Sequence, residues 1–213
     1  MKKAIILLVL ISFAAGVSTL SAWPRPSLVS KPGQWTLDVT YEHPRQITVQ
    51  VPGSSEPQRY WYMIVSLTNN TDQEIPFYPA PEIVTDTFRT VPSGCEVQQL
   101  LYDQVKAQYR GSYPFLESQD FDDHIIRQGK DNTRDFVLFW PDFDPKANQI
   151  RFFIGGLSNE TTAVNHPTRV DEAGNPQKVF LQKTLQLTYL IGVDPSLRSQ
   201  GSLNFENQEW VMR

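Results

Sequence analysis

Apolar and polar residues alternate along much of this chain, with the period of two that predicts β-strands buried on one face. The longest such segment, residues 179–191, places Leu185 and Leu187 on one face and Thr184 on the other. Residues 136–140 are apolar on both faces, which predicts a central strand. The strand candidates are residues 35–41, 47–51, 60–68, 75–78, 83–87, 136–140, 150–154, 179–191 and 209–212.

The pattern changes to helical spacing once, at residues 96–109. Ser93 and Glu96 have the S-x-x-E spacing of a capping box, and Gly111 follows the expected end of the helix. Apolar residues recur at helical intervals at Val97, Leu100, Leu101 and Val105. We therefore expect one amphipathic helix packed against the strands.

Seven to nine strands, one helix and turns rich in proline and glycine predict a mostly β fold. The specific expectation is a two-layer antiparallel β-sandwich of immunoglobulin-like architecture, with the helix inserted at about 96–109. Residues 165–176 are polar and contain proline and glycine, so they are expected to form a loop. Because the chain has no internal repeat and no change of composition, residues 35–213 are expected to form a single domain.

Two parts of the chain resemble a known family. Residues 62–71 read YMIVSLTNNT, an apolar strand that ends in an Asn-Asn turn. Gly129 then precedes the apolar residues 136–139 and the turn DFDP at residues 142–145. In this respect residues 35–157 resemble secreted bacterial immunoglobulin-like modules. The resemblance implies a β-sandwich and an exported location, and it assigns no catalytic residue.

The N-terminus has the layout of a secretory signal. Two lysines precede an apolar run at residues 4–17, and small residues follow. We expect residues 1–22 to be a signal peptide that is cleaved after Ala22, and residues 23–34, with three prolines, to be an extended linker. The alternative is an uncleaved anchor, since about 17 apolar residues can span a bilayer. Contact with a membrane is expected only in that case.

The composition and charge of the chain limit the cellular compartment and the kinds of partner that we expect. The 213 residues carry a formal charge of -4, and removal of a signal with two lysines would take it to -6. Because an acidic chain has no excess of Lys and Arg for phosphates, we expect no nucleic-acid partner. Cys95 is the one cysteine of the chain, so no intramolecular disulfide supports the fold. These features are typical of the bacterial periplasm or cell surface.

Aromatic residues are the first candidates for a binding surface. Tyr60 and Tyr62 share one face of a predicted strand, and Phe77 and Tyr78 lie in a proline-rich edge at residues 76–81. Exposed rings stack on sugars or anchor a partner protein. The alternative is that these rings pack in the core and across strands.

Acidic residues are the second candidates. Asp120, Asp122 and Asp123 offer oxygen ligands in one short segment, which suits Ca²⁺. Their spacing is not that of a D-x-D-x-D-G calcium loop, and the alternative is that they cap turns in contact with solvent. Two carboxylates at a suitable separation would also serve a glycoside hydrolase.

Cys95 is the third candidate, because it lies near the expected start of the helix. There the helix dipole would lower the thiol pKa, and His124 or His166 would act as the base. The alternative is a buried cysteine that fills space under the first turn. No G-x-S-x-G, P-loop, G-x-G-x-x-G or H-E-x-x-H motif occurs in the sequence, which favours a protein without catalytic activity.

Together these features predict an exported, non-enzymatic envelope domain that binds a protein or an envelope polysaccharide. Two alternatives stay open. One is a carbohydrate-binding module or small glycoside hydrolase, based on the aromatic residues and carboxylates. The other is a calcium-stabilised adhesion or assembly module, based on residues 120–123. No cofactor other than calcium is expected.

Overall fold

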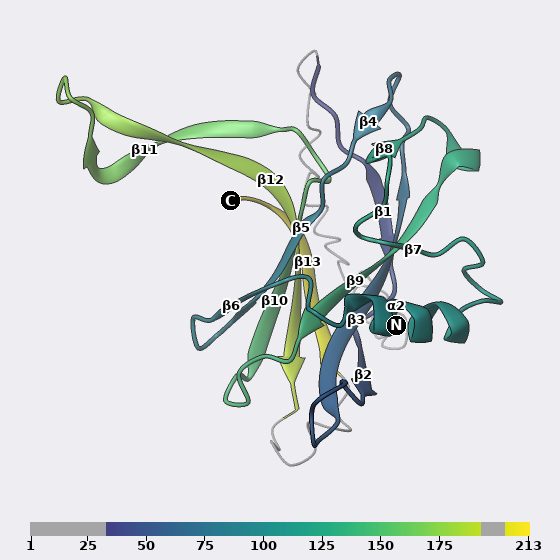
Figure 1. Ribbon diagram of the computed structural model, residues 1–213. Helices are drawn as coiled ribbons and strands as arrows, with labels where there is room; N and C mark the ends of the chain where they lie inside the picture. Colours follow the sequence, from purple (N-terminus) through teal and green to yellow (C-terminus); the bar gives the residue numbers. More distant parts are fainter. Residues whose placement is uncertain (1–32, 193–202) are drawn as a thin grey trace, which may run out of the picture. The chain divides into compact units, whose positions relative to one another are not determined.

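The computed structural model describes residues 33–192 and 203–213. Within these residues the chain is mostly β, with several antiparallel sheets and one α-helix (Figure 1). The predicted signal peptide and nearly all of the predicted linker lie outside the described residues. None of the helices described is long and apolar enough to cross a membrane.

The first sheet has five strands and is centred on β3 and β9. Its strands are β1 (Asp38–Tyr41), β2 (Arg45–Val49), β3 (Gln58–Thr68), β7 (Glu117–Ser118) and β9 (Arg134–Pro141). Strands β1 and β2 follow one another along one edge of β3, and β9 lies on its other edge. The central position predicted for residues 136–140 is confirmed, because β9 lies between β3 and β7. The β7–β9 pair is parallel, unlike the other strand pairs of this sheet.

The second sheet has six strands. They are β5 (Ala80–Thr85), β6 (Thr90–Pro92), β10 (Gln149–Gly155), β11 (Thr161–Val170), β12 (Pro176–Ile191) and β13 (Leu203–Met212). On one edge of β12, β11 pairs with the first part of the strand and β10 pairs with the part that follows. On the other edge, β12 pairs with β13. A separate short pair joins β4 (Ile75–Pro76) to β8 (Ile125–Ile126), and a single 3₁₀ turn, η1, covers Lys130–Asn132.

Two sequence predictions for this sheet are wrong. Much of the expected loop at residues 165–176 is strand, because β11 continues to Val170 and β12 begins at Pro176. The last strand is also longer than residues 209–212, since β13 begins at Leu203. Both segments are mostly exposed, so their strand structure rests on backbone pairing and leaves little trace in the hydrophobic pattern.

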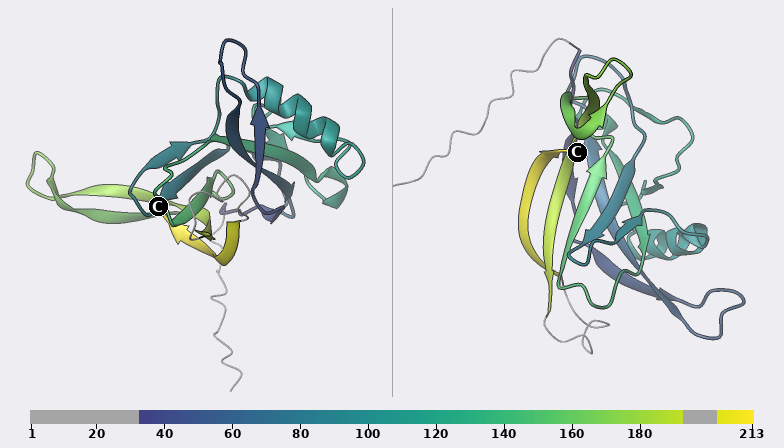
Figure 2. Two further views of the ribbon diagram at one scale, coloured as in Figure 1. Left: turned by 90° about the horizontal axis from the view of Figure 1, so that it is seen from below. Right: turned by 90° about the vertical axis from the view of Figure 1, so that its left-hand side faces the viewer.

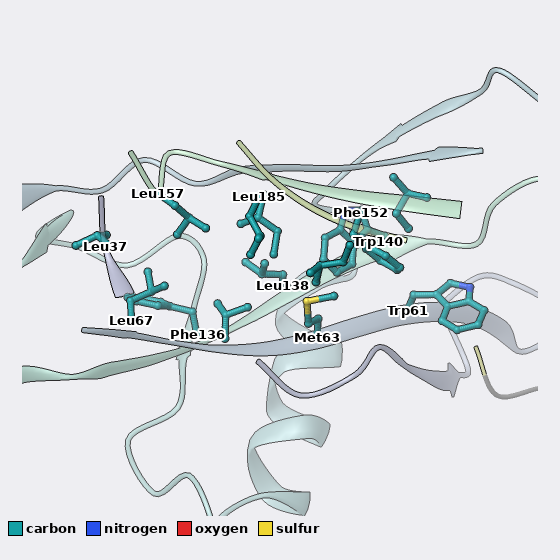
Figure 3. Close-up of a cluster of buried hydrophobic side chains, with 14 of the residues drawn as sticks. Leu37, Trp61, Met63, Leu67, Phe136, Leu138, Trp140, Phe152, Leu157 and Leu185 are labelled. Atoms are coloured by element: carbon teal, nitrogen blue, oxygen red, sulfur yellow. The ribbon is translucent and has the colours of Figure 1, made fainter. Parts of the chain in front are cut away.

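The main hydrophobic core is formed by residues of both large sheets (Figure 3). Met63 and Leu138 from the first sheet belong to the same buried cluster as Phe152 and Leu185 from the second sheet. The rings of Trp140 and Phe152 meet edge to face with centroids 5.0 Å apart, which adds a directional contact to the burial of both rings.

A second buried cluster lies on the opposite face of the first sheet, beneath the helix. Helix α2 (Gln98–Gln108) buries Leu101 and Val105 against the face of β9 that carries its odd-numbered residues. The expected amphipathic helix is thereby confirmed. The expected capping box is not formed, because the helix begins after Val97 and no side chain caps it. The sequence pattern therefore predicted the helix correctly, but not the residue at which the helix begins.

Candidate functional site

A long hairpin is formed by β11 and the first part of β12. It extends beyond the body of the second sheet (Figures 1 and 2). Its register runs from Thr161 opposite Gln182 to Val170 opposite Pro176. Every side chain of β11 is exposed except half-buried His166. We call residues 161–182 the arm.

The tip of the arm is held by its own hydrogen bonds. Asp171 accepts bonds at Oδ1 from the N–H groups of Ala173 and Asn175, at 3.0 and 2.8 Å. The backbone N–H of Asp171 also donates to the carbonyl of Asn175 at 2.8 Å. Gly174 has φ of +84°, a conformation that glycine adopts without strain. The turn is therefore a defined structure that fixes the register of the two strands.

The base of the arm is fixed to the body by a half-buried cluster around Lys183. Its ammonium lies 2.5 Å from Glu160 Oε1 and 3.2 Å from Thr36 Oγ1. It also lies 5.2 Å from the centre of the Trp210 ring, a cation–π contact. The Lys183 side chain is only 7% exposed, so these contacts replace the water that its ammonium group loses on burial. The cluster fixes the point where the arm leaves the sheet.

Apolar side chains on the arm are open to solvent. Phe180 is 72% exposed, and Val170 and Val164 are exposed as well. Phe180 lies opposite Ala163, so one arm face carries a ring beside a small side chain, while Val179 and Val164 lie opposite one another on the other face. An isolated two-stranded hairpin has little stability in water. Contact with another molecule that covers these apolar side chains would therefore stabilise the arm.

The aromatic residues proposed from the sequence do not form a surface together. Tyr60 and Tyr62 are buried in the cluster beneath α2, and Phe77 is buried in the main core. Burial raises the pKa of Tyr62, whose hydroxyl lies 3.3 Å from that of Tyr109. Of the four rings only Tyr78 is exposed, at 66%. The other three are buried because the main core covers one face of β3 and includes Phe77, and the cluster beneath α2 covers the other face of β3.

Two of the predicted binding residues contact the acidic segment: buried Phe77, whose N–H donates to the carbonyl of His124 at 2.8 Å, and exposed Tyr78. The Tyr78 ring stacks on that of His124, with centroids 4.8 Å apart and planes inclined by 26°. His124 has a positive φ of 46°, and its ring also lies against that of Phe121, with centroids 4.8 Å apart. The stack is a short aromatic surface at the side of the β4–β8 pair.

Two of the three predicted calcium ligands have different partners. Asp120 accepts a bond from Gln98 Nε2 at 2.5 Å, and Asp123 is ion-paired with Arg134 at 2.6 Å. The hydrogen bond from Arg134 holds the pKa of the Asp123 carboxyl below its usual value. In the described part of the chain no three His, Cys, Asp or Glu side chains form a group that could hold a metal ion. The calcium hypothesis stays a prediction, with no support from the arrangement of Asp120, Asp122 and Asp123.

Cys95 precedes α2 and is half-buried. Burial raises the pKa of its thiol, although a backbone hydrogen bond with Val97 acts in the opposite direction. The expected activation by the helix is thus absent, since Cys95 stands three residues before the first residue of α2 and in an apolar cluster. The His124 ring stacks on that of Tyr78 and lies tilted against that of Phe121, and His166 lies on the arm.

The outer face of the second sheet carries a shallow polar hollow of about 480 Å³. Gln149 donates to Glu206 at 3.0 Å, and Gln186 donates to Glu209 at 2.6 Å. The remaining lining residues are Arg151, Thr188 and Asn207. Amides and carboxylates in this arrangement can bind the hydroxyl groups of a sugar, which both donate and accept hydrogen bonds.

The chain matches no protein-family model, no curated protein and no solved structure.

The arm is the feature that sequence reasoning missed. Residues 179–181, which read VFL, were within a predicted strand, but their partner residues 161–165 read TTAVN and gave no alternating signal. The one available signal was the length of the predicted strand at residues 179–191, which exceeds that of a strand confined to one small sheet.

Proposed function

We propose that this chain is an exported, non-enzymatic envelope domain that binds a partner protein through the arm. The observation that carries the proposal is the exposure of the arm: a hairpin with a defined turn and a fixed base holds Phe180 and Val170 in solvent. Large exposed apolar side chains on a fixed scaffold are typical of contacts between proteins. Sequence features of the N-terminus support export, with cleavage after Ala22.

The fold is part of the same proposal. We infer that the two large sheets are the layers of an immunoglobulin-like β-sandwich, as in the secreted modules that the sequence resembles. The shared core of β3, β9, β10 and β12 supports two packed layers. In such a domain the sheets supply stability, and loops and hairpins at the periphery supply binding.

Site-specific crosslinking in the bacterial envelope tests the proposal. A photoreactive amino acid is introduced at Phe180 on the arm and, as a matched control, at Phe88, which is 95% exposed on the body. The proposal expects one discrete crosslinked protein from position 180 and none from position 88. Equal crosslinking at both positions, or none at either, would count against binding through the arm. The mass of the purified protein tests cleavage after Ala22.

A carbohydrate-binding function is the second candidate, and the polar hollow is the observation that favours it. Glu206, Glu209 and Arg151 give this face one net negative charge, which suits a neutral or basic sugar. Glycan-array binding that is lost in Gln186→Ala would support this function. A protein that retains no polysaccharide would count against it.

A further inference from the structure

The two edges of the arm differ in what they offer to another strand. On β11 the register shifts between Asn165 and Val170, and Pro167 lies inside the shift. His166 Nδ1 there accepts bonds from the N–H groups of Thr168 and Arg169, at 3.2 and 2.9 Å. Proline and bulges are the usual means by which an edge is protected from pairing. The edge of β11 is therefore protected.

The opposite edge of the arm, residues 176–181 of β12, keeps a regular strand. Gln182 exchanges both backbone hydrogen bonds with Arg213, at 2.7 and 3.0 Å, whereas the N–H of Lys183 donates to Glu160 on the other side. Backbone groups of a strand point alternately to its two edges. The N–H and C=O groups of Phe180 and Lys178 therefore point to the same side as those of Gln182. Among the described residues no strand pairs with β12 there.

We propose that this edge of β12 accepts an extended segment of another polypeptide as an added β-strand. The inference rests on the proposed function, because it assigns the mode of binding to the same arm. The added strand would lie in line with β13 and continue the ladder beyond Arg213. Six residues of strand give a site about 20 Å long. Strand addition supplies affinity through main-chain bonds and specificity through alternate side chains.

Side chains along the edge define the chemistry of the added strand. Lys178 and Phe180 lie on one face, and Val179 and Leu181 lie on the other. Lys178 is exposed and forms no ion pair with a described residue, so it favours an acidic residue opposite it. Phe180 favours an apolar residue. The expected segment thus has an acidic and an apolar residue two positions apart.

A second copy of the chain fits this edge poorly. Pairing of Lys178 with Lys178 of the copy would place two ammonium groups directly opposite each other. Pairing of Lys178 with Phe180 would bring Pro176 opposite Gln182 of the copy, where Arg213 already occupies the edge. Pairing of Phe180 with Phe180 would bring Lys178 to that same occupied position. A foreign segment has none of these obstacles.

Substitution by proline distinguishes binding through an added strand from binding through apolar side-chain contact alone. Phe180→Pro removes the ring and the outward N–H, while the bonds to β11, made by Val179 and Leu181, remain. Phe180→Thr removes the ring and keeps the N–H. Ala163→Pro is the matched control, because it removes an outward N–H from the other edge of the arm.

The probe is a phage-displayed library of linear dodecapeptides, selected on the full-length protein. We expect enriched peptides with alternating apolar and acidic residues. They should bind wild type and Ala163→Pro equally, and Phe180→Pro about fivefold more weakly than Phe180→Thr, as expected for one lost hydrogen bond. Slow hydrogen exchange at Val179 and Leu181 checks that the arm of Phe180→Pro is folded. N-methylation of alternate amides in the peptide should weaken binding in the same way.

Several outcomes would overturn the inference. Equal binding by Phe180→Pro and Phe180→Thr, or the absence of any selected peptide, would show that the edge does not pair. Slow exchange of the Lys178 and Phe180 amides in the free protein would show that this chain or a second copy already covers the edge, and sedimentation would distinguish the two. Peptides that bind equally well after deletion of the arm would contradict the proposed function itself.

Discussion

Gln182 and Arg213 exchange two backbone hydrogen bonds, and this pair marks the boundary between the body of the second sheet and the arm. On the body side, β12 has β10 on one edge and β13 on the other. On the arm side it has β11 alone among the described strands. Residues on the two sides of this pair should therefore respond differently to substitution, because only those on the body side contribute to the core.

Shortening of the arm should leave the body stable. Replacement of residues 163–180 by a two-residue Asn-Gly turn joins Thr162 to Leu181, which lie opposite one another. We expect the free energy of unfolding to change by less than about 1 kcal/mol, because the removed side chains are nearly all exposed. Urea denaturation followed by tryptophan fluorescence measures the change. A loss of several kcal/mol would mean that the arm packs against the body.

The Lys183–Glu160 pair should be important for stability. Both side chains are largely buried, so Glu160→Ala leaves the Lys183 ammonium without its carboxylate. We expect a loss of about 3 kcal/mol in the free energy of unfolding. The double variant Glu160→Ala with Lys183→Met should recover part of that loss, because the buried charge is removed. Equilibrium denaturation of the three proteins checks this, and an exposed pair such as Arg127–Glu74 is the control.

Gly156 should not tolerate a side chain. Its φ is +87°, and an added Cβ would lie 2.4 Å from the carbonyl oxygen of Tyr78. Gly156→Ala therefore combines backbone strain with a clash against backbone, and we expect a loss of at least about 2 kcal/mol. Gly174→Ala is the control, since its φ of +84° is similar but no atom lies within 4 Å. Thermal melting should rank wild type above Gly174→Ala and Gly174→Ala above Gly156→Ala.

The sequence predicted the parts of the fold that bury apolar side chains. Leu185, Leu187 and Tyr189 are buried on one face of β12, as their alternation indicates, and α2 buries Leu101 and Val105. The alternation of apolar and polar residues does not show which element of the fold covers a given face of a strand. Tyr60 and Tyr62 were therefore placed on a candidate surface, although the helix covers them.

The candidate site was harder to predict for a physical reason. An exposed hairpin is held by backbone bonds that any residue can make, so residues 161–165 carry no hydrophobic period. Similarly, the sequence placed Asp120, Asp122 and Asp123 together but could not show that Arg134 pairs with one of them. Long-range pairing of this kind depends on the tertiary structure alone.

Cys95 should react slowly with thiol reagents. Burial raises the pKa of its thiol above the ordinary value of 9.0, so the thiolate is scarce at neutral pH. We expect native protein at pH 7.5 to react with a chromogenic disulfide much more slowly than protein unfolded in urea. A glutathione thiol measured in the same buffer is the reference. Native protein that reacts faster than the reference would restore Cys95 as a candidate nucleophile.

The ion pair of Asp123 with Arg134 should make stability depend on pH in the acid range. The folded pKa of Asp123 lies below its usual value of 3.8, chiefly because of the hydrogen bond from Arg134. The carboxylate therefore stabilises the folded state above pH 3.8, and this contribution is lost as the pH falls through the lower folded pKa. Asp123→Asn should be less stable than wild type at pH 6, and the difference should shrink as the pH falls below 3.8 and through the lower folded pKa. Asp122→Asn, at an exposed carboxylate with no ion pair to a described residue, is the matched control. Urea denaturation from pH 2 to pH 7 gives the three curves, and a constant difference between Asp123→Asn and wild type would show that the loss arises from packing and not from charge.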